Sequence, residues 1–308
     1  MSNILITGGS GMLGSAFRKF LPDAVYISSK DYDLRDRNQV DAMYTKYRPE
    51  CVIHLASRVG GVLANMQNLG DFYFDNIMIN TNILDAAKTF EVKKVLSCLS
   101  TCIYPDKVNY PLTEDQIHSG PPHSSNYTYA YTKRMIDIQS RAYRNQFGCN
   151  FISMSPNNLF GEHDNFDLED SHVIPAMIRK IYEAKNNNDN VVMWGDGSPL
   201  REFTYVDDIC RISLLLLEKY DNPEPINVGT TGERTIKNIA SKIANYFDFE
   251  GDVVWDTSKP KGQHRKPSDN SRLLELGWKE EDYTDFDKAL HKTCKWFEDN
   301  YPNIRGVK

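Results

Sequence analysis

The sequence predicts an α/β protein in which a doubly wound parallel sheet is joined to a smaller mixed α/β lobe. Short apolar runs alternate with helix-length amphipathic segments through the first half of the 308-residue chain. This alternation is typical of a parallel sheet whose crossovers are helices. After Gly161 the pattern loosens into longer polar stretches. Long loops often build sites, so a second and differently built lobe is expected there.

Five segments of the first half are expected to be buried strands, because each is short, apolar and bounded by turns or helices. They are Ile4–Thr7, Ala24–Ile27, Cys51–Leu55, Lys94–Leu99 and Asn150–Met154. Two further sets of positions recur at helical spacing, and helices packed on the sheet are expected there. The sets are Ile77, Thr81, Leu84 and Ala87, and then Met135, Ile138 and Ala142.

Composition and charge exclude several classes of protein. With 40% hydrophobic and 25% charged residues the chain has the composition of a globular protein. A net charge of -6 disfavours a broad nucleic-acid or membrane surface. The chain start, at 1–8, has the pattern of a strand and turn rather than a signal peptide, and no apolar run approaches a membrane span, so a cytoplasmic protein is expected. Six scattered cysteines form no CxxC pair, which favours reduced thiols and no metal.

A glycine-rich turn follows the first strand directly. Thr7–Gly14 reads TGGSGMLG, a GxxGxxG spacing that opens an apolar helix through Met12 and Leu13. Gly8 and Gly11 would let the backbone approach a pyrophosphate, and Gly14 would let helix and strand pack closely. The turn therefore predicts a Rossmann-type dinucleotide site, with an ordinary glycine-rich turn as the alternative.

The residues after the second strand favour NADP over NAD. An NAD enzyme usually places a carboxylate about 20 residues beyond the glycine turn. This chain has Ser29 and Lys30 there, and a hydroxyl and a cation suit a 2'-phosphate. Asp31 nearby weakens the preference, and Lys30 could equally be a solvated surface residue. Further candidates are Asp33 and Leu34 beside the adenine and Leu55 and Ala56 on the cofactor floor.

Three residues suggest a carbonyl reduction centre. Ser100 follows the fourth strand, and Tyr129 precedes Lys133 by four residues, which places both side chains on one helix face. A nearby ammonium would lower the pKa of the phenol, which could then give its proton to a carbonyl oxygen as hydride arrives. YxxxK alone is a weak motif. Glycine turn, Ser100, Tyr129 and Lys133 together, in this order, resemble the short-chain dehydrogenase family.

Three longer stretches resemble the signature segments of the GDP-L-fucose synthases, a family of epimerase-reductases. They are Ser97–Pro105 (SCLSTCIYP), Asn165–Ile178 (NFDLEDSHVIPAMI) and Trp194–Asp208 (WGDGSPLREFTYVDD). The resemblance implies 3,5-epimerisation and NADPH-dependent 4-reduction of GDP-4-keto-6-deoxy-D-mannose to GDP-L-fucose. It also implies that Cys102 and His172 are the acid and base of epimerisation. On the residues alone, Cys102 could be a small buried hydrophobe and His172 a helix cap.

The resemblance further implies a set of binding residues. Asn158 and His172 would contact the cofactor, although Ser155–Gly161 departs locally from the family's wording. Substrate-binding candidates are Lys180, Trp194, Arg201, Arg265 and Lys266, the last two in the Lys259–Lys266 loop. Cations suit a diphosphate and an aromatic ring suits a flat base. A solvated helix lysine, a core tryptophan and a solvated charged loop are the alternative interpretations.

The expected organisation is an NADP-binding Rossmann domain at 1–162, with a returning segment at about 201–230. A substrate-binding lobe would comprise about 163–200 and 231–308. The resemblance implies a homodimer, joined through a four-helix bundle formed by the helices at about Tyr73–Phe90 and Tyr127–Phe147. A GDP-sugar is the expected ligand, with no nucleic acid, membrane or metal.

Two alternative functions remain. The first is another nucleotide-sugar enzyme of the same fold, a 4-epimerase or 4,6-dehydratase with tightly held NAD. Ser28–Lys30 disfavours it, and Thr101-Cys102 stands where dehydratases tend to carry an acidic pair. The second is a non-catalytic NADP-binding sensor, which the retention of Ser100, Tyr129 and Lys133 disfavours.

Overall fold

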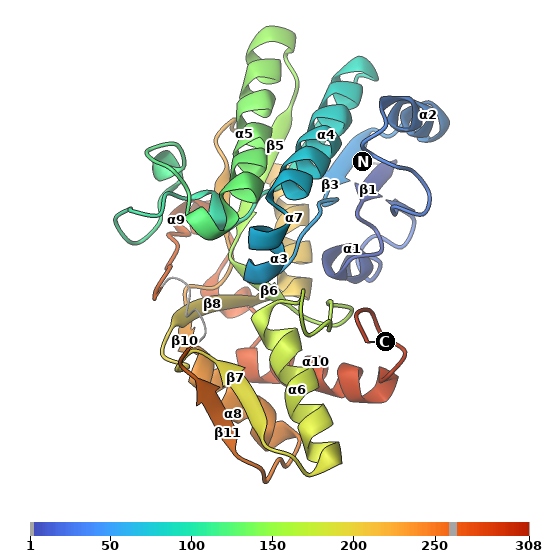
Figure 1. The fold of residues 1–308 in the computed structure, drawn as a ribbon. Coiled ribbons are helices and arrows are strands. Elements are labelled where there is room, and N and C mark those ends of the chain that lie inside the picture. The colour runs from blue at the N-terminus through green and yellow to red at the C-terminus, as the bar shows by residue number, and fades with distance from the viewer. Residues whose placement is uncertain (1–2, 259–263, 308) are drawn as a thin grey trace.

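The larger part of the molecule is a parallel six-stranded sheet with the order β2-β1-β3-β4-β5-β9 (Figure 1). A computed structural model describes residues 3–258 and 264–307. The strands are β1 (Ile4–Thr7), β2 (Val25–Ile27), β3 (Cys51–His54), β4 (Lys94–Cys98), β5 (Phe151–Pro156) and β9 (Ile226–Val228). The chain passes from β1 to β2 on one side and then to β3 on the other. The doubly wound fold and its five expected strands are therefore confirmed, with small shifts at their ends.

Helices cover both faces of this sheet because its strands are apolar on both sides. Leu5, Val52 and Val95 belong to one buried cluster, and their neighbours Ile6, Ile53 and Leu96 belong to another. Alternate residues of a strand point to opposite faces. The helices of the large domain are α1 (Met12–Phe17), α2 (Arg37–Tyr47), α3 (Val62–Gln67), α4 (Leu69–Thr89), α5 (Tyr127–Phe147) and α7 (Val206–Lys219). α1 packs on α7, and α4 packs along α5.

The orientation of α5 differs from the expectation. Met135, Ile138 and Ala142 are exposed, while Lys133, Ile136 and Ser140 are buried. The apolar spacing at 135–142 therefore marks an outer face of the helix and not the face against the sheet. Periodicity detects an apolar stripe, but it does not say which neighbour the stripe faces.

In the described residues the second lobe is built from two small sheets and three helices. β10 (Glu233–Thr235), β8 (Leu200–Tyr205) and β6 (Asn158–Phe160) form one sheet, and β11 (Val253–Asp256) pairs with β7 (Val191–Trp194). Its helices are α6 (Val173–Asn187), α8 (Ile236–Tyr246) and α10 (Phe286–Asn300), whereas the short helix α9 (Ser271–Glu275) contacts β9 of the large sheet. Four single 3-10 turns complete the described elements: η1 (Thr101–Ile103), η2 (Glu114–Gln116), η3 (Ser124–Asn126) and η4 (Glu280–Asp282).

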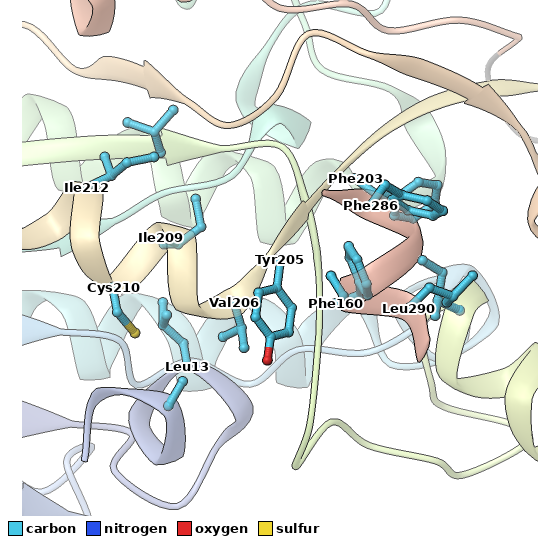
Figure 2. Packing of buried hydrophobic residues seen from close by; sticks show 14 of the residues in the cluster. Leu13, Phe160, Phe203, Tyr205, Val206, Ile209, Cys210, Ile212, Phe286 and Leu290 are labelled. Atoms are coloured by element: carbon cyan, nitrogen blue, oxygen red, sulfur yellow. The ribbon is translucent and has the colours of Figure 1, made fainter. Parts of the chain in front are cut away.

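One hydrophobic cluster runs from the large sheet into the second lobe. Leu13 of α1 lies beside Val206 and Cys210 of α7, and the cluster continues through Phe160 to Phe286 (Figure 2). The ring centroids of Phe160 and Phe286 are 5.3 Å apart. β8 belongs to the small sheet, whereas α7 and β9 return to the large one.

Of the helices described here, none combines the length and apolarity that a membrane crossing requires.

Candidate active site

The glycine turn lies at the carboxyl ends of β1 and β3, where the winding of the sheet changes direction. Gly8 has a φ of +74°, and a Cβ atom on it would lie 2.9 Å from the backbone nitrogen of Ala56. A Cβ on Gly14 would collide with the Gly8 carbonyl oxygen. Side chains are therefore excluded at Gly8 and Gly14, where the turn presents its backbone. Ligands of doubly wound folds bind at such a switch point, and this surface fits a pyrophosphate.

A buried hydrogen-bonded chain holds this turn against the helices. The Thr7 hydroxyl lies 2.8 Å from Nδ1 of His54, and it accepts from the backbone nitrogens of Leu55 and Ala56 at 3.2 Å each. Nε2 of His54 lies 3.0 Å from Oδ1 of Asn80, an oxygen that can only accept. Burial and nearby Lys133 lower the pKa of His54 to about 3, so the imidazole is neutral.

His54 and Asn80 therefore place Leu55 and Ala56 beside Gly8. Sequence reasoning missed both residues, since a histidine that ends an apolar strand gives no indication of its partners.

The segment expected to face the 2'-phosphate is an exposed turn. Ser29 and Lys30 are exposed. The Asp31 carboxylate accepts from the Ser28 backbone nitrogen at 2.8 Å and from the Ser28 hydroxyl at 2.6 Å, and these bonds lower the pKa of Asp31. Asp31 is thus turned toward its own loop, and Lys30 leaves a cation at the surface for an anionic ligand.

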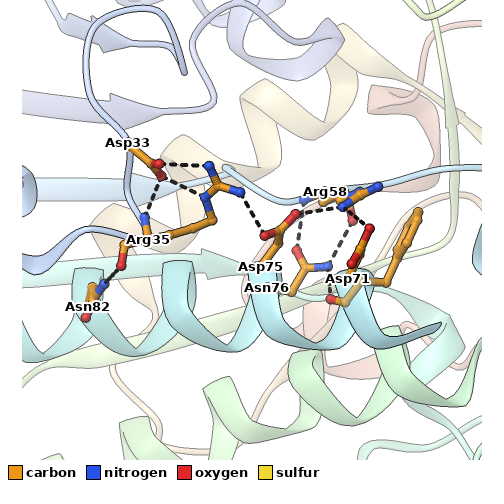
Figure 3. Close-up of polar contacts among 8 residues, drawn as sticks. Asp33, Arg35, Arg58, Asp71, Asp75, Asn76 and Asn82 are labelled. Atoms are coloured by element: carbon orange, nitrogen blue, oxygen red, sulfur yellow. Dashed lines mark hydrogen bonds and ion pairs between the residues drawn. The ribbon is translucent and has the colours of Figure 1, made fainter. Parts of the chain in front are cut away.

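An alternating chain of charges continues from this turn (Figure 3). Arg35 donates to both oxygens of Asp33, at 2.9 and 2.8 Å, and to Asp75 at 3.0 Å. Arg58 donates to the other oxygen of Asp75 at 2.8 Å. The Asp33 carboxylate is therefore fixed by Arg35, which lowers its pKa. Leu34, the residue between them, is buried in the core cluster of α2 and α4.

Ser100, Tyr129 and Lys133 meet at the carboxyl end of β4. Lys133 is buried at 2% exposure, and its Nζ donates to the Cys98 carbonyl oxygen at 2.8 Å. The same Nζ lies 5.8 Å from the centre of the Tyr129 ring. The pKa of Tyr129 is not lowered, contrary to the expectation from the nearby ammonium: burial raises it well above its usual value, helped by Cys102 and Cys98 and opposed by a hydrogen bond with Ser57. Burial also lowers the pKa of Lys133.

Tyr131, the other tyrosine near Lys133, is exposed beneath Arg134, whose guanidinium lies 5.4 Å from its ring. Among the described tyrosines of this helix start, Tyr129 is thus the one beside the buried ammonium.

Cys102 stands in the turn that follows Ser100. Its backbone nitrogen donates to the Ser100 hydroxyl at 3.3 Å, so the two residues share one short 3-10 turn. Burial raises the pKa of the Cys102 thiol, while the positive charge of Lys266, the Ser100 hydroxyl and Lys133 act in the opposite direction. Burial lowers the pKa of Lys266 to about 8, and Cys102 opposes that shift. Lys266 and Cys102 are therefore electrostatic neighbours.

His172 is exposed and immediately precedes α6. Burial raises the pKa of the nearby Asp164 carboxyl, and an electrostatic interaction with His172 opposes that rise. Val173, the next residue, lines a cavity of about 210 Å³ together with Asn158, Trp194 and Arg201. The structure thus brings three predicted contact residues to one cavity, whereas His172 is not among the residues that line it and only precedes Val173 in the chain.

The other predicted substrate-binding residues lie outside the lining of this cavity and differ in their contacts. Lys180 donates to the Val192 carbonyl oxygen at 3.1 Å, and its Nζ lies 5.7 Å from the Trp194 ring. Arg265 is exposed and its Nε donates to Glu233 at 2.9 and 2.7 Å. Lys266 lies near Cys102 and Arg201. Residues 259–263 of the predicted loop lie outside the described residues.

Within the described ranges, histidine, cysteine and acidic side chains form no group of three able to hold a metal ion.

The chain forms a doubly wound sheet with a glycine turn at its switch point and a Ser–Tyr–Lys set at the next strand end. These features define a nicotinamide-dinucleotide oxidoreductase of the extended short-chain type. Residues 4–229 match the NAD dependent epimerase/dehydratase family. The chain is 42% identical to the GDP-L-fucose synthase of Dictyostelium discoideum, over 98% of this chain and 97% of that protein. It is 37% identical to the GDP-L-fucose synthase of Escherichia coli, over 98% of each.

Solved structures agree with these relatives. A GDP-L-fucose synthetase from Naegleria fowleri bound to NADP superimposes with a TM-score of 0.93 at 42% identity, covering 99% of this chain and 95% of that one. The chain belongs to the NAD dependent epimerase/dehydratase family and, within it, to the GDP-L-fucose synthases.

Proposed function

We propose that this protein catalyses the 3,5-epimerisation and NADPH-dependent 4-reduction of GDP-4-keto-6-deoxy-D-mannose to GDP-L-fucose. The observation that carries the proposal is the position of Cys102. Its thiol follows Ser100 by two residues in one turn, and it interacts electrostatically with both Tyr129 and Lys133. In this proposal a group able to move protons stands beside the two hydroxyls, of Ser100 and Tyr129, that would contact a carbonyl oxygen.

The NADPH site would use the glycine turn for the pyrophosphate, with Gly8, Gly11 and Gly14 giving access to backbone and Met12 and Leu13 opening the helix. Leu55 and Ala56 would form the floor, and Ser29 and Lys30 would meet the 2'-phosphate, with Asp33 and Leu34 near the adenine. Asn158 and His172 would border the nicotinamide end. When bound, NADPH supplies the hydride.

Epimerisation would be the work of the chain's own residues. A ketone at sugar carbon 4 acidifies the protons on carbons 3 and 5, so an acid and a base can invert each centre through an enolate. Cys102 and His172 would serve as these proton-transfer groups. The hydroxyls of Ser100 and Tyr129 would stabilise the enolate oxygen.

The reduction that follows uses the same oxygen contacts. Tyr129 would protonate the oxygen at carbon 4, because the burial that raises the pKa of its phenol keeps the proton in place until the hydride arrives. A single pair of hydroxyls would thus serve both reactions, so the sugar need not leave the site between them.

The GDP part of the substrate would occupy the side of the site formed by the second lobe. Arg201 and Lys266 are close enough to interact and repel each other electrostatically, so an anion between them is favoured. Trp194, exposed at 44%, would lie beside the nucleotide. Lys180 and Arg265 would contribute positive charge at the edge. In this proposal 1–162, with about 201–230, binds NADPH and the remainder binds the sugar nucleotide.

We infer that two copies associate through α4 and α5. Tyr127, Tyr131, Met135 and Ile138 are 41%, 38%, 37% and 46% exposed and follow one another at helical spacing. Tyr73 and Phe74 of the adjacent α4 are 48% and 58% exposed. An exposed apolar face of this kind marks an interaction surface, and two such pairs of helices would form a four-helix bundle. We place the protein in the cytoplasm, because all six cysteines are free thiols.

The test is to mix purified protein with GDP-4-keto-6-deoxymannose and NADPH, follow NADPH absorbance, and identify products by NMR. Wild type is expected to oxidise NADPH and yield GDP-fucose. Cys102→Ser is expected to yield reduced sugar that is not epimerised, whereas Cys149→Ser, a half-buried cysteine after α5, should behave as wild type. If wild type leaves NADPH untouched, the assignment is wrong.

A further inference from the structure

Glu202 is a buried carboxylate to which the proposed chemistry gives no role. It follows Arg201 on β8 and is only 1% exposed. Its oxygens accept from the Ser268 backbone nitrogen at 3.2 and 3.1 Å, from the Ser268 hydroxyl at 2.6 Å, and from Nδ2 of Asn157 at 3.3 Å. A buried carboxylate is costly, so this one needs its hydrogen bonds, and three of its four close contacts go to Ser268.

Ser268 is the carboxyl-terminal end of segment 264–268, which contains Lys266, and its hydrogen bonds to Glu202 hold that end against β8. At the other end, the backbone nitrogen of Leu200 donates to the His264 carbonyl oxygen at 2.9 Å. Leu112 donates from its backbone nitrogen to the Pro267 carbonyl oxygen at 2.8 Å. Segment 264–268 is therefore attached to β8 at both ends and braced from the loop that follows Cys102. Lys266 stands between these attachments, near Cys102 and Arg201.

Arg201 and Glu202, which are neighbours on β8, have different roles because they lie on opposite faces of the strand. Successive side chains of a strand point to opposite faces. Arg201 lines the cavity, and Glu202, on the other face, holds the segment that brings a second cation to the site. One strand thereby fixes the spacing between the two cations. A flexible segment would have to be ordered each time a ligand binds, which weakens binding.

We propose that Glu202 is a positioning residue, which fixes segment 264–268 through Ser268 and thereby holds Lys266 where it meets the diphosphate of the substrate. The inference rests on the proposed function for its substrate. The hydrogen bonds of Glu202, rather than its charge, set the position of Lys266. Loss of these bonds releases Lys266 and leaves the glycine turn of the NADPH site unchanged, because the hydrogen bonds of Glu202 are to Ser268 and Asn157.

The kinetic test is a double-mutant cycle of Glu202→Ala and Lys266→Ala, with KM and kcat for the GDP-sugar and Kd for NADPH. Glu202→Ala is expected to raise KM roughly tenfold or more with a smaller change in kcat, and to leave the Kd for NADPH within about twofold. In Lys266→Ala, adding Glu202→Ala should have almost no further effect, because Glu202 acts through Lys266. Fully additive effects would overturn the proposal.

Conservative variants separate positioning from folding. Glu202→Gln is expected to restore KM to within about threefold of wild type, because its amide can accept from the Ser268 backbone while the Ser268 hydroxyl turns to accept. Glu202→Gln with the KM of Glu202→Ala would contradict the proposed role of the hydrogen bonds. Asp287→Asn, which removes a surface ion pair with Lys242 in the same lobe, is the control and should leave KM unchanged.

Hydrogen exchange gives a readout that needs no turnover. The amides of a peptide over 264–270 should exchange at least about tenfold faster in Glu202→Ala than in wild type or Glu202→Gln. Unchanged exchange would overturn the inference. If wild type fails to use the GDP-sugar but exchange responds as expected, the proposed function is wrong and the positioning of the segment stands. If Glu202→Ala does not fold, Ser268→Ala removes the 2.6 Å bond alone and should show the same two effects in smaller measure.

Discussion

Replacing Glu202 with glutamine should change how the stability of the protein depends on pH. Burial raises the pKa of Glu202 from 4.5 to about 7, against the hydrogen bonds from Ser268 and Asn157, which lower it. The folded chain therefore holds the proton more tightly than the unfolded chain does. The protonated Glu202 side chain therefore contributes to the unfolding free energy. This contribution is fully present below about pH 4.5 and is lost as the pH rises through about 7. Glutamine is neutral throughout and mimics the protonated acid.

The size of the effect follows from the pKa. A rise from 4.5 to about 7 corresponds to about 3 kcal/mol between the two protonation states. Between about pH 5.5 and about pH 8.5, linkage predicts that wild type loses about 2 kcal/mol of unfolding free energy through this group, and that Glu202→Gln does not. Other titrating groups contribute equally to both proteins, so the difference between them isolates Glu202.

The assay is equilibrium urea unfolding of both proteins at the same protein concentration and at several pH values across this interval. The unfolding free energies should converge at acid pH, separate as the pH rises to about 7 and keep a constant difference above that, with the glutamine variant more stable. Parallel curves would show that the carboxyl keeps its ordinary pKa, and the burial argument would fail. Control measurements on Asp287→Asn should run parallel to wild type, because that carboxylate is exposed.

Three further predictions concern the catalytic pair, the cofactor and the exposed helix face. Tyr129→Phe should lower the rate of ketone reduction by about a hundredfold or more with the Kd for NADPH unchanged; activity within tenfold of wild type would remove Tyr129 from the reaction. Lys30→Ala should raise the Kd for NADPH about tenfold, measured by fluorescence titration, with little change for NADH; equal changes for both would deny contact with the 2'-phosphate. Ile138→Glu should convert a dimer to a monomer in sedimentation velocity, and an unchanged sedimentation coefficient would move the interface elsewhere.

The fold was accessible from the sequence because its strands are short apolar runs between turns. Five of the strands of the large sheet follow from such runs, and the glycine turn marks where the winding changes. The direction of α5 was not accessible, since Met135 and Ile138 form an apolar stripe that faces outward. A stripe packed on a sheet and a stripe left for another copy have the same periodicity.

The candidate site was partly accessible for a similar reason. Ser100, Tyr129 and Lys133 have motif spacing, and the structure brings them together. No motif spacing marks His54, Asn80 or Glu202, because their hydrogen-bond partners are 26 to 66 residues away in the chain. A buried histidine or glutamate in an apolar strand differs little in sequence from an ordinary interruption of that strand. Only the three-dimensional arrangement identifies what these residues support.

The measurement that tests the central claim most directly is solvent isotope exchange. GDP-4-keto-6-deoxymannose is incubated with the enzyme in D2O without NADPH, and deuterium at carbons 3 and 5 is followed by NMR. Wild type is predicted to incorporate deuterium at both carbons. In Cys102→Ser the rate of incorporation should fall by about a hundredfold or more, while the variant should still reduce the ketone once NADPH is added. Exchange by Cys102→Ser at the wild-type rate would contradict the placement of epimerisation at this thiol.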